Sequence, residues 1–234
     1  MSEAAEVHPF VYPGSELVLF EKAVNWKRYW RAQIAPFVHG SVLETGAGIG
    51  SNTKLLASLS YRSWTCLEPD AALAAQIELP TGKHRKITGT IADLFGSFDT
   101  IIYIDVLEHI EDDAAEMARA AARLNRGGHL IVLAPAHAFL YAPFDAAVGH
   151  FRRYSRASLR RVAPAGLRES KVVYLDAVGL LASSGNRLLI RRSMPTEQQI
   201  LVWDRLMIPI SRAIDPLFGH SLGKSVLGIW QREA

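Results

Sequence analysis

Short strand-like segments alternate with helix-like segments along most of the chain. The strand-like segments are bounded by glycine, proline or polar residues, and most of them are rich in apolar residues. They fall at residues 41–45, 61–67, 83–88, 99–105, 129–134, 171–175 and 225–230. Segments typical of helices lie between them at 51–59, 70–77, 113–124 and 155–161. This alternation favours an α/β domain in which helices cover both faces of a mostly parallel sheet.

Two helical regions are added to this alternating pattern. Before the first strand, apolar residues recur every three or four positions, which predicts one helix that starts after Gly14 and ends before Pro36. Its apolar stripe comprises Leu19, Ala23, Trp26, Trp30 and Ile34. A long insertion separates the last two strands, and its apolar residues predict helices at 178–190 and 198–214. We therefore expect residues 177–222 to form a helical cap.

A glycine loop joins the first strand to the helix that follows it. Gly46, Gly48 and Gly50 occupy every second position there, and glycine is required where φ is positive or where a ligand lies against bare backbone. The helix opens with free N–H groups that face such a ligand. The spacing differs from the G-x-G-x-x-G of dinucleotide-binding folds. Glu44 precedes the loop, and Glu68 ends the second strand, where an acid can bind the hydroxyls of a ribose.

The fourth strand carries a second landmark at its carboxyl end. Its continuous apolar run suits a central strand that is covered on both faces. Asp105 ends the strand at the edge of the sheet where α/β folds bind their ligands. Asp113 and Glu116 have the spacing of a capping box for the next helix. We expect that helix to stop at Gly127 and Gly128, before the fifth strand.

Together, these motifs resemble those of class I S-adenosylmethionine-dependent methyltransferases. The resemblance extends from Val42 to Tyr154. Over this segment the chain is similar to a bacterial subgroup of small-molecule methyltransferases, type 11/12. It implies a Rossmann-like, doubly wound sheet of seven strands, mostly parallel with an antiparallel last strand, plus the helical cap. It also implies S-adenosyl-L-methionine as cofactor, S-adenosyl-L-homocysteine as product, and no metal. We expect one domain over residues 1–234, with an N-terminal helical lid at 1–40.

The resemblance also implies which residues bind the cofactor. The glycine loop would hold the methionyl part and Glu68 the ribose. Family members commonly place an acid directly after the glycine that follows the third strand, where it contacts adenine. Here that position is Thr90, and the acid comes later, at Asp93. Backbone groups of Thr90 and Ile91 would then serve instead, with Asp93 available if the loop bends inward. The predicted set is Glu44, Gly46, Ala47, Gly48, Gly50, Asn52, Glu68, Pro69, Thr90, Ile91, Asp93, Asp105 and Val106.

Two histidines are the candidates for catalysis. Methyl transfer from a sulfonium is an in-line displacement, so the protein chiefly aligns the nucleophile and removes its proton. Histidine suits that proton transfer near neutral pH. His109 follows the fourth strand, and His150 lies in the long connection at 135–154. His109 has the alternative role of positioning its loop, and for Glu108 we expect a salt bridge or a helix start rather than catalysis.

The acceptor site is predicted from the N-terminal helix and from the connection at 135–154. Loops at the carboxyl edge of a sheet usually carry chemistry, and in methyltransferases of this type an N-terminal helix often closes the substrate site. One of Arg152 and Arg153 pairs either with an acidic group of the substrate or with Asp145. The candidate substrate-binding residues are Tyr12, Trp26, His137, Tyr141, Arg153 and Tyr154.

Charge is uneven along the chain, although the net charge is only +3. Residues 150–192 contain ten Lys or Arg against two Asp or Glu. This basic segment favours contact with an anionic substrate, phospholipid head groups or nucleic acid, or else its arginines solvate helix faces. A small-molecule acceptor ranks above nucleic acid, because aromatic residues are not interleaved with the arginines as in a stacking platform. The apolar face of the cap packs on the domain or on a second subunit, walls a hydrophobic substrate site, or makes peripheral lipid contact.

Several features bear on the cellular location. No run of about eighteen apolar residues is present, so we expect no membrane-spanning helix. The first ten residues lack a basic cluster before an apolar run, which argues against a secretory signal. The single cysteine, Cys66, excludes an internal disulfide. We therefore expect a cytoplasmic monomer or homodimer. Two alternatives stay open: a nicotinamide-dependent oxidoreductase on a related sheet, and a methyltransferase-like protein that binds the cofactor without turnover.

Overall fold

The structure, a computed structural model, describes residues 11–14, 16–79, 82–189 and 194–233. In this part of the chain seven strands form one sheet, in the order β3-β2-β1-β4-β5-β7-β6. The strands are β1 (Ser41–Thr45), β2 (Ser63–Glu68), β3 (His84–Thr88), β4 (Phe98–Ile104), β5 (Leu124–Pro135), β6 (Leu167–Leu175) and β7 (Ser225–Arg232). Strands β1 to β5 pair in parallel, and β7 is antiparallel to both β5 and β6. The predicted mostly parallel sheet with an antiparallel last strand is confirmed.

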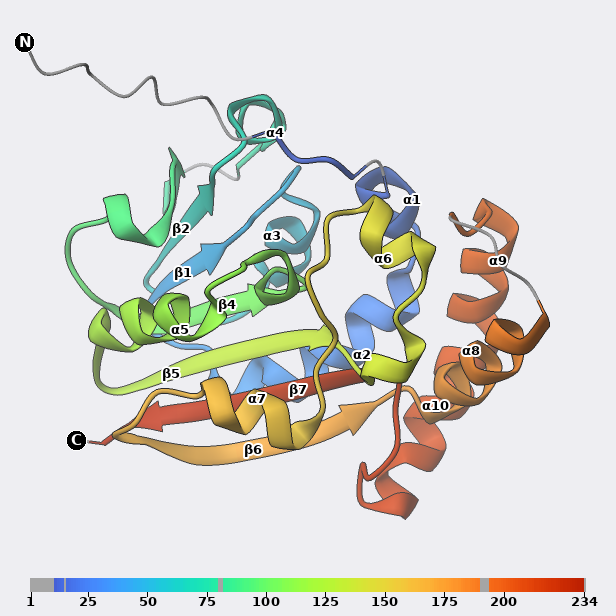
Figure 1. Ribbon diagram of the computed structural model, residues 1–234. Coiled ribbons are helices and arrows are strands. Elements are labelled where there is room, and N and C mark those ends of the chain that lie inside the picture. The colour runs from blue at the N-terminus through green and yellow to red at the C-terminus, as the bar shows by residue number, and fades with distance from the viewer. Residues whose placement is uncertain (1–10, 15, 80–81, 190–193, 234) are drawn as a thin grey trace, which may run out of the picture.

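Helices cover both faces of this sheet (Figure 1). They are α2 (Val24–Ile34) and α3 (Ser51–Leu56) on one face, and α5 (Asp113–Ala122) and α7 (Arg156–Val162) on the other. Successive side chains of a strand point to opposite faces, so Ile102 of β4 joins the core beneath α2 while Tyr103 joins the core beneath α5. The long apolar run predicted for a central strand therefore supplies two separate core layers.

Short helical elements follow the carboxyl ends of the parallel strands. They are α4 (Ala71–Gln76) after β2, η2 (Ile91–Asp93) after β3, η3 (Leu107–His109) after β4, and η4 (Ala138–Leu140) and α6 (Pro143–Ala147) after β5. Because these strands run in one direction, all five elements gather at one edge of the sheet. This is the edge where α/β folds bind their ligands.

The N-terminal region differs from its prediction. In place of one helix, the chain forms α1 (Leu17–Glu21) and α2, with a break at Lys22 and Ala23, and Pro36 falls within a further 3₁₀ turn, η1 (Ala35–Phe37). Asp204, from the insertion, accepts hydrogen bonds from the Asn25 N–H at 3.1 Å and the Trp26 N–H at 2.8 Å. These N–H groups belong to the first turn of α2 and have no partner within the helix. A tertiary contact therefore caps α2 and stabilises its start at this point.

The helix after the fourth strand also differs. Its N-cap is Asp112, which accepts a hydrogen bond from the Ala115 N–H, and not Asp113 as predicted. The helix ends at Ala122, and β5 begins at Leu124, five residues before the predicted strand. Gly127, predicted to stop the helix, lies inside β5 with a φ of 77°. Pairing of Leu124 with Phe98 extends the strand backward, which the sequence pattern does not reveal.

The insertion is helical, as predicted, but not regular. It contains α8 (Ala177–Leu189), α9 (Glu197–Val202), the π-helical turn η5 (Trp203–Met207), α10 (Ile208–Ile214) and the 3₁₀ turn η6 (Asp215–Phe218). The predicted single helix at 198–214 is therefore interrupted by a π-helical turn just before Pro209, a residue that has no N–H to donate. The apolar residues of the insertion are not all buried: Ile200 and Ile208 are buried, while Leu181 and Leu206 are exposed.

The insertion and α1 lie beyond the carboxyl ends of the strands, and α2 continues from there across one face of the sheet (Figure 1). The Trp26 and Trp203 rings lie 5.8 Å apart, and the Tyr29 hydroxyl donates to Asp215 at 2.7 Å. We call α1, α2 and the helices between β6 and β7 the cover. Across the described residues, no helix is both long and apolar enough to cross a membrane.

Candidate active site

The glycine loop after β1 has the backbone that its sequence requires. Gly46, Gly48 and Gly50 have φ values of 61°, 55° and 80°, a conformation that disfavours other residues. A Cβ atom at Gly46 would lie 2.5 Å from the Val106 side chain. A Cβ atom at Gly48 would meet only Leu17 of α1, at 3.6 Å. The loop thus presents bare backbone to a space that Leu17 covers.

Glu68, at the end of β2, lies across from this loop. Its Oε2 accepts a hydrogen bond from the Gly48 N–H at 2.7 Å, and its Oε1 accepts one from the Asp70 N–H at 3.0 Å. Burial raises the pKa of the Glu68 carboxyl, while these two hydrogen bonds act in the opposite direction. Each carboxylate oxygen can accept a second hydrogen bond. Glu68 is therefore held in place with capacity left for two hydroxyl groups.

A cavity of about 480 Å³ lies beside Glu68 and the glycine loop. The predicted cofactor residues that line it are Gly46, Gly48, Glu68, Pro69, Thr90, Ile91, Asp105 and Val106. We call it the donor cavity. Apolar walls come from Leu73, Ile110 and Phe151, which the sequence analysis did not include. Of these, Phe151 adjoins the predicted His150, whereas Leu73 and Ile110 carry no distinguishing sequence signal.

Three predicted cofactor residues do not line either cavity described here. Glu44 is buried, and its Oε2 accepts hydrogen bonds from the Thr53 hydroxyl at 2.6 Å and the Trp64 indole N–H at 2.8 Å. Burial raises the pKa of Glu44 to about 7. Gly50 is the N-cap of α3. Asp93 turns back to accept hydrogen bonds from its own loop, so the loop does not bend inward as the sequence analysis had allowed.

A second cavity, of about 1380 Å³, lies between the sheet edge and the cover. We call it the acceptor cavity. Trp26, Trp203 and Phe144 form part of its apolar wall, and the Lys224 ammonium lies 4.4 Å from the centre of the Trp203 ring. Two residues predicted for the cofactor, Ala47 and Asn52, line this cavity instead of the donor cavity. The residues common to both cavities are Tyr12, Leu17, Gly46, Gly48, Asp105 and His109.

Asp105 stands at this junction in an unusual backbone conformation. Its φ is 54°, and its N–H donates to the Leu133 carbonyl at 2.8 Å. The side chain is accessible to solvent from the cavities and otherwise surrounded by protein. Desolvation by the surrounding protein raises the pKa of Asp105 to about 6. Positive φ at a non-glycine residue is often found at functional sites.

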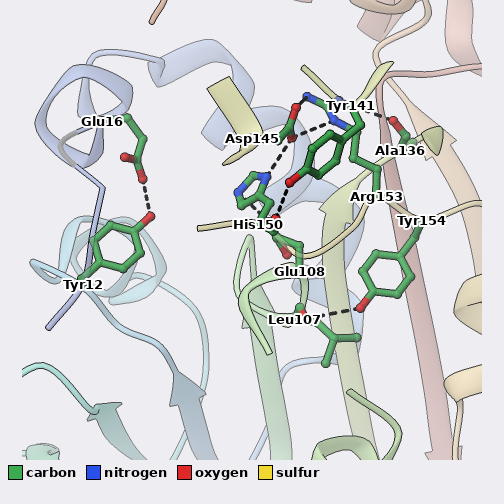
Figure 2. A network of polar contacts seen from close by, with 10 residues as sticks. All are labelled: Tyr12, Glu16, Leu107, Glu108, Ala136, Tyr141, Asp145, His150, Arg153 and Tyr154. Atoms are coloured by element: carbon green, nitrogen blue, oxygen red, sulfur yellow. Dashed lines mark hydrogen bonds and ion pairs between the residues drawn. The ribbon is translucent and has the colours of Figure 1, made fainter. Parts of the chain in front are cut away.

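A pair of histidines, His109 and His150, lines the acceptor cavity together with Asp105, and Figure 2 shows His150 with its partner Asp145. The rings of His109 and His150 are 4.5 Å apart and nearly perpendicular. His150 Nδ1 lies 2.8 Å from Asp145 Oδ1, and Arg153 bonds both oxygens of Asp145 at 2.8 and 3.0 Å. Of the two roles left open for Arg153, the structure has the pairing with Asp145. Burial lowers the pKa of His109 to about 4, so its imidazole is neutral near pH 7.

Glu108 lies within the same group, in the first turn of η3, and a helix start was one of its two predicted roles. It is fully buried, and burial together with the nearby Asp105 charge raises its pKa well above the ordinary value. Its Oε1 is 3.9 Å from His150 Nε2, too far for a hydrogen bond. Among the described residues neither carboxylate oxygen has a hydrogen-bond partner from another residue. The other predicted role, a salt bridge, corresponds to this 3.9 Å contact with His150, which includes no hydrogen bond.

The predicted substrate residues separate into two groups. Tyr12, Trp26, Tyr141 and Arg153 line the acceptor cavity. His137 and Tyr154 line neither cavity, in contrast to the prediction. The His137 ring bonds the Gly223 carbonyl at 2.9 Å and packs on Tyr174, and the Tyr154 hydroxyl donates to Asp113 at 2.7 Å. Their polar atoms are thus used to join neighbouring segments.

The basic segment at 150–192 uses part of its charge internally. Arg152 pairs with Asp113 at 2.7 Å, and Arg160 pairs with Glu169 at 2.7 Å. Arg153 pairs with Asp145, as described above. These ion pairs weaken the alternative in which the arginines form one surface that is free to bind anions.

The fold and the site together define a class I, Rossmann-like methyltransferase. Residues 24–165 match the sequence profile of the family described as "Methyltransferase domain". Because this match spans more than half of the sequence, the chain belongs to that methyltransferase family. Its cofactor is S-adenosyl-L-methionine, as the sequence motifs implied. A search of curated proteins found no match.

Solved structures of methyltransferases share this fold. An S-adenosylmethionine-dependent methyltransferase from Mesorhizobium loti is 15% identical, with a TM-score of 0.62 over 92% of this chain and 100% of its own. N-methyltransferase NodS from Bradyrhizobium japonicum is 14% identical, with a TM-score of 0.57 over 94% and 100%. Phosphoethanolamine N-methyltransferase 2 from Haemonchus contortus, in complex with S-adenosyl-L-methionine, is 12% identical, with a TM-score of 0.63 over 94% and 58%. At these identities the likeness concerns the fold alone.

The donor cavity fits this cofactor. Glu68 is oriented by two backbone N–H groups and has unused acceptor capacity for the two hydroxyls of a ribose. The backbone at Gly48 is open to the cavity and lies beneath Leu17. Thr90 and Ile91 line the same cavity, and the Thr90 N–H already donates to Asp93 Oδ2 at 2.8 Å.

Proposed function

We propose that this protein transfers a methyl group from S-adenosyl-L-methionine to a small, largely apolar acceptor. One observation carries the proposal: the donor cavity and the acceptor cavity share lining residues at the carboxyl ends of β1 and β4. A donor bound in the first cavity would thereby present its reactive end to the second. The acceptor cavity has an aromatic wall formed by Trp26, Phe144 and Trp203, which suits an apolar molecule.

Residues of this chain have distinct roles in the proposal. Bound S-adenosyl-L-methionine supplies a methyl group that is already activated by its sulfonium. Glu68 binds the ribose, the backbone at Gly46 and Gly48 holds the methionyl part, and Thr90 and Ile91 contact adenine. His109 and His150 face the acceptor and act at its nucleophilic atom. Alignment of that atom with the methyl group supplies much of the rate enhancement in such a reaction.

The N-terminal lid at 1–40 is part of this proposal, as far as the described residues 11–14 and 16–40 are concerned. The Tyr12 N–H donates to Asp70 Oδ2 at 2.7 Å, and the Tyr12 hydroxyl donates to Glu16 (Figure 2). Tyr12 and Leu17 lie in the walls of both cavities. We infer that this segment closes over bound cofactor and must open for exchange. The cytoplasmic location, the oligomeric state and peripheral lipid contact stay predictions.

The proposal is tested in two stages. Calorimetry measures binding of S-adenosyl-L-methionine, S-adenosyl-L-homocysteine and a nicotinamide dinucleotide. Release of S-adenosyl-L-homocysteine is then measured with a panel of apolar alcohols, phenols and amines, and with RNA as a macromolecular acceptor. Micromolar binding of the first two ligands alone, with turnover on a small molecule, supports the proposal. Cofactor binding with no turnover, or turnover on RNA alone, would overturn it.

Two variants of the cover sharpen this test. Trp203→Ala removes part of the aromatic wall and is expected to raise the acceptor KM about tenfold or more, without changing the cofactor Kd. Leu217→Ala is the control, because Leu217 lies on the same cover but is 81% exposed. Equal effects of the two substitutions would show that the cover does not bind the acceptor.

A further inference from the structure

Three side chains that can bind a metal meet in the wall of the acceptor cavity. Glu108 and His109 are neighbours on η3, and His150 approaches from the connection that follows α6. One ligand atom of each lies within 4.8 Å of the others. Figure 2 shows Glu108 beside His150 at this point. The group was not expected from the sequence, which implied no metal.

Both histidines are held so that a ring nitrogen with a free lone pair remains. Asp145 accepts hydrogen bonds from Arg153 at both of its oxygens, at 2.8 and 3.0 Å, and lies 2.8 Å from His150 Nδ1, so His150 Nδ1–H donates to it. His150 Nε2 therefore carries the lone pair. The His109 ring is bonded to the backbone of Val148 and Gly149, which uses its N–H in the same way. In metal-binding histidines, the ring N–H that does not face the metal typically donates to a carboxylate or a carbonyl in this way.

Glu108 provides an independent reason to expect a cation. Its carboxylate has no exposed surface, and within the described chain no other residue donates a hydrogen bond to it. An unpartnered carboxylate in the interior costs free energy, and native proteins pair such groups or use them to bind metals. At 3.9 Å from Glu108 Oε1, His150 Nε2 is too distant to share a proton with it. A cation between the two atoms would satisfy both.

We propose that Glu108, His109 and His150 bind a divalent transition-metal ion such as zinc, with its open coordination positions facing the acceptor cavity. Zinc lies about 2.0–2.2 Å from nitrogen and oxygen ligands, so tetrahedral ligand atoms are about 3.4 Å apart. The separation of 3.9 Å between Glu108 Oε1 and His150 Nε2 exceeds this by roughly half an ångström, which a small side-chain rotation removes. Two imidazoles and one carboxylate with open positions form the ligand set of several catalytic zinc and iron sites.

The proposed metal specifies the acceptor chemistry, and in this respect it rests on the proposed function. An acceptor hydroxyl coordinated at an open position would lose its proton to solvent near neutral pH, because a divalent cation lowers its pKa. The oxygen would then form a bond to the methyl carbon as the carbon–sulfur bond breaks. The electron pair of that bond returns to sulfur, which leaves neutral S-adenosyl-L-homocysteine. His109 and His150 would thus act as ligands rather than as the base, and the acceptor would be an alcohol or phenol.

The test uses the full-length protein, stripped with a chelator and checked for residual metal. Calorimetry with Zn²⁺ measures affinity and stoichiometry, and absorption with Co²⁺ reports the coordination sphere. We expect one ion per chain, and at least tenfold weaker binding with loss of the Co²⁺ bands in both Glu108→Gln and His150→Gln. His137→Gln is the matched control, because His137 lines neither cavity. Zn²⁺ affinity that is equal in the wild type and Glu108→Gln would overturn the inference.

Cofactor binding, measured on the same samples, separates the two proposals. Glu108 does not line the donor cavity, so Glu108→Gln is expected to keep its affinity for S-adenosyl-L-homocysteine. Retained cofactor affinity also demonstrates that the variant is folded. Cofactor binding without specific metal binding would refute the metal site alone. Metal binding without cofactor binding would refute the proposed function and leave the metal site in place.

Discussion

Replacing Glu68 by alanine tests the central contact of the donor cavity. Glu68 is 4% exposed, and each of its two carboxylate oxygens already accepts one backbone N–H. The lone pairs that remain face the donor cavity, where we propose that they bind the ribose hydroxyls. The Glu68→Ala variant removes these acceptors and leaves space for water, which restores part of the hydrogen bonding. We therefore expect a loss in the range of a single hydrogen bond to a charged group.

The expected change in Kd follows from the loss of one such hydrogen bond. A hydrogen bond to a charged group contributes about 1.5–3 kcal/mol. The Kd for S-adenosyl-L-homocysteine should consequently rise about 10- to 150-fold, since 1.4 kcal/mol corresponds to a factor of ten. The fold should also lose stability, because the N–H groups of Gly48 and Asp70 lose their acceptors. The Kd must therefore be measured well below the thermal transition of the variant.

Isothermal calorimetry with S-adenosyl-L-homocysteine is the assay. Glu68→Gln should give a smaller loss, since its amide carbonyl still accepts hydrogen bonds. Glu78→Ala is the control, because it removes an exposed carboxylate that pairs with Lys54 on the surface. A Glu68→Ala variant that is folded and binds with a Kd within twofold of the wild type would refute the role of Glu68.

Two further predictions concern stability. The pKa of Glu44 is raised from 4.5 to about 7, so Glu44 stabilises the fold below pH 4.5 and this contribution is lost as the pH rises to 7. Between pH 5 and pH 8 the wild type should therefore lose about 2–3 kcal/mol more unfolding free energy than Glu44→Gln, as measured in urea titrations. An equal pH dependence of the two proteins would contradict this. Asp204→Ala removes the tertiary cap of α2 and should lower the unfolding free energy by about 2–4 kcal/mol. A loss below about 0.5 kcal/mol would show that Asn25 and Trp26 find other acceptors.

Elements that depend on local requirements were predictable. The glycine loop needs positive φ at Gly46, Gly48 and Gly50, and only glycine adopts this readily, so the sequence states the requirement directly. Apolar runs of strand length likewise mark buried strands, and the strand direction places Glu68 and Asp105 at one edge of the sheet. These features explain why the fold and the donor cavity were anticipated.

Other features depended on hydrogen bonds that the sequence pattern does not reveal. The N-terminal stripe has the period of one helix, yet Asp204 caps α2 after a break that no local signal marks. Asp93 carries the carboxylate expected of an adenine contact, but this carboxylate accepts hydrogen bonds from Thr90 in its own loop. His137 and Tyr154 look equivalent to Tyr141 in sequence, and only their tertiary contacts direct them away from the cavities.

Short-range periodicity and backbone geometry account for the succession of strands and helices along the chain, for the glycine loop and for the acids at the strand ends, so the sequence is enough to predict them. Which side chains converge depends on the packing of distant segments. Glu108 follows β4, whereas His150 lies in a connection beyond β5, and only the packing of those segments brings their side chains together. Whether a polar group is used internally or faces a cavity depends on its neighbours in space, which spacing along the chain does not specify.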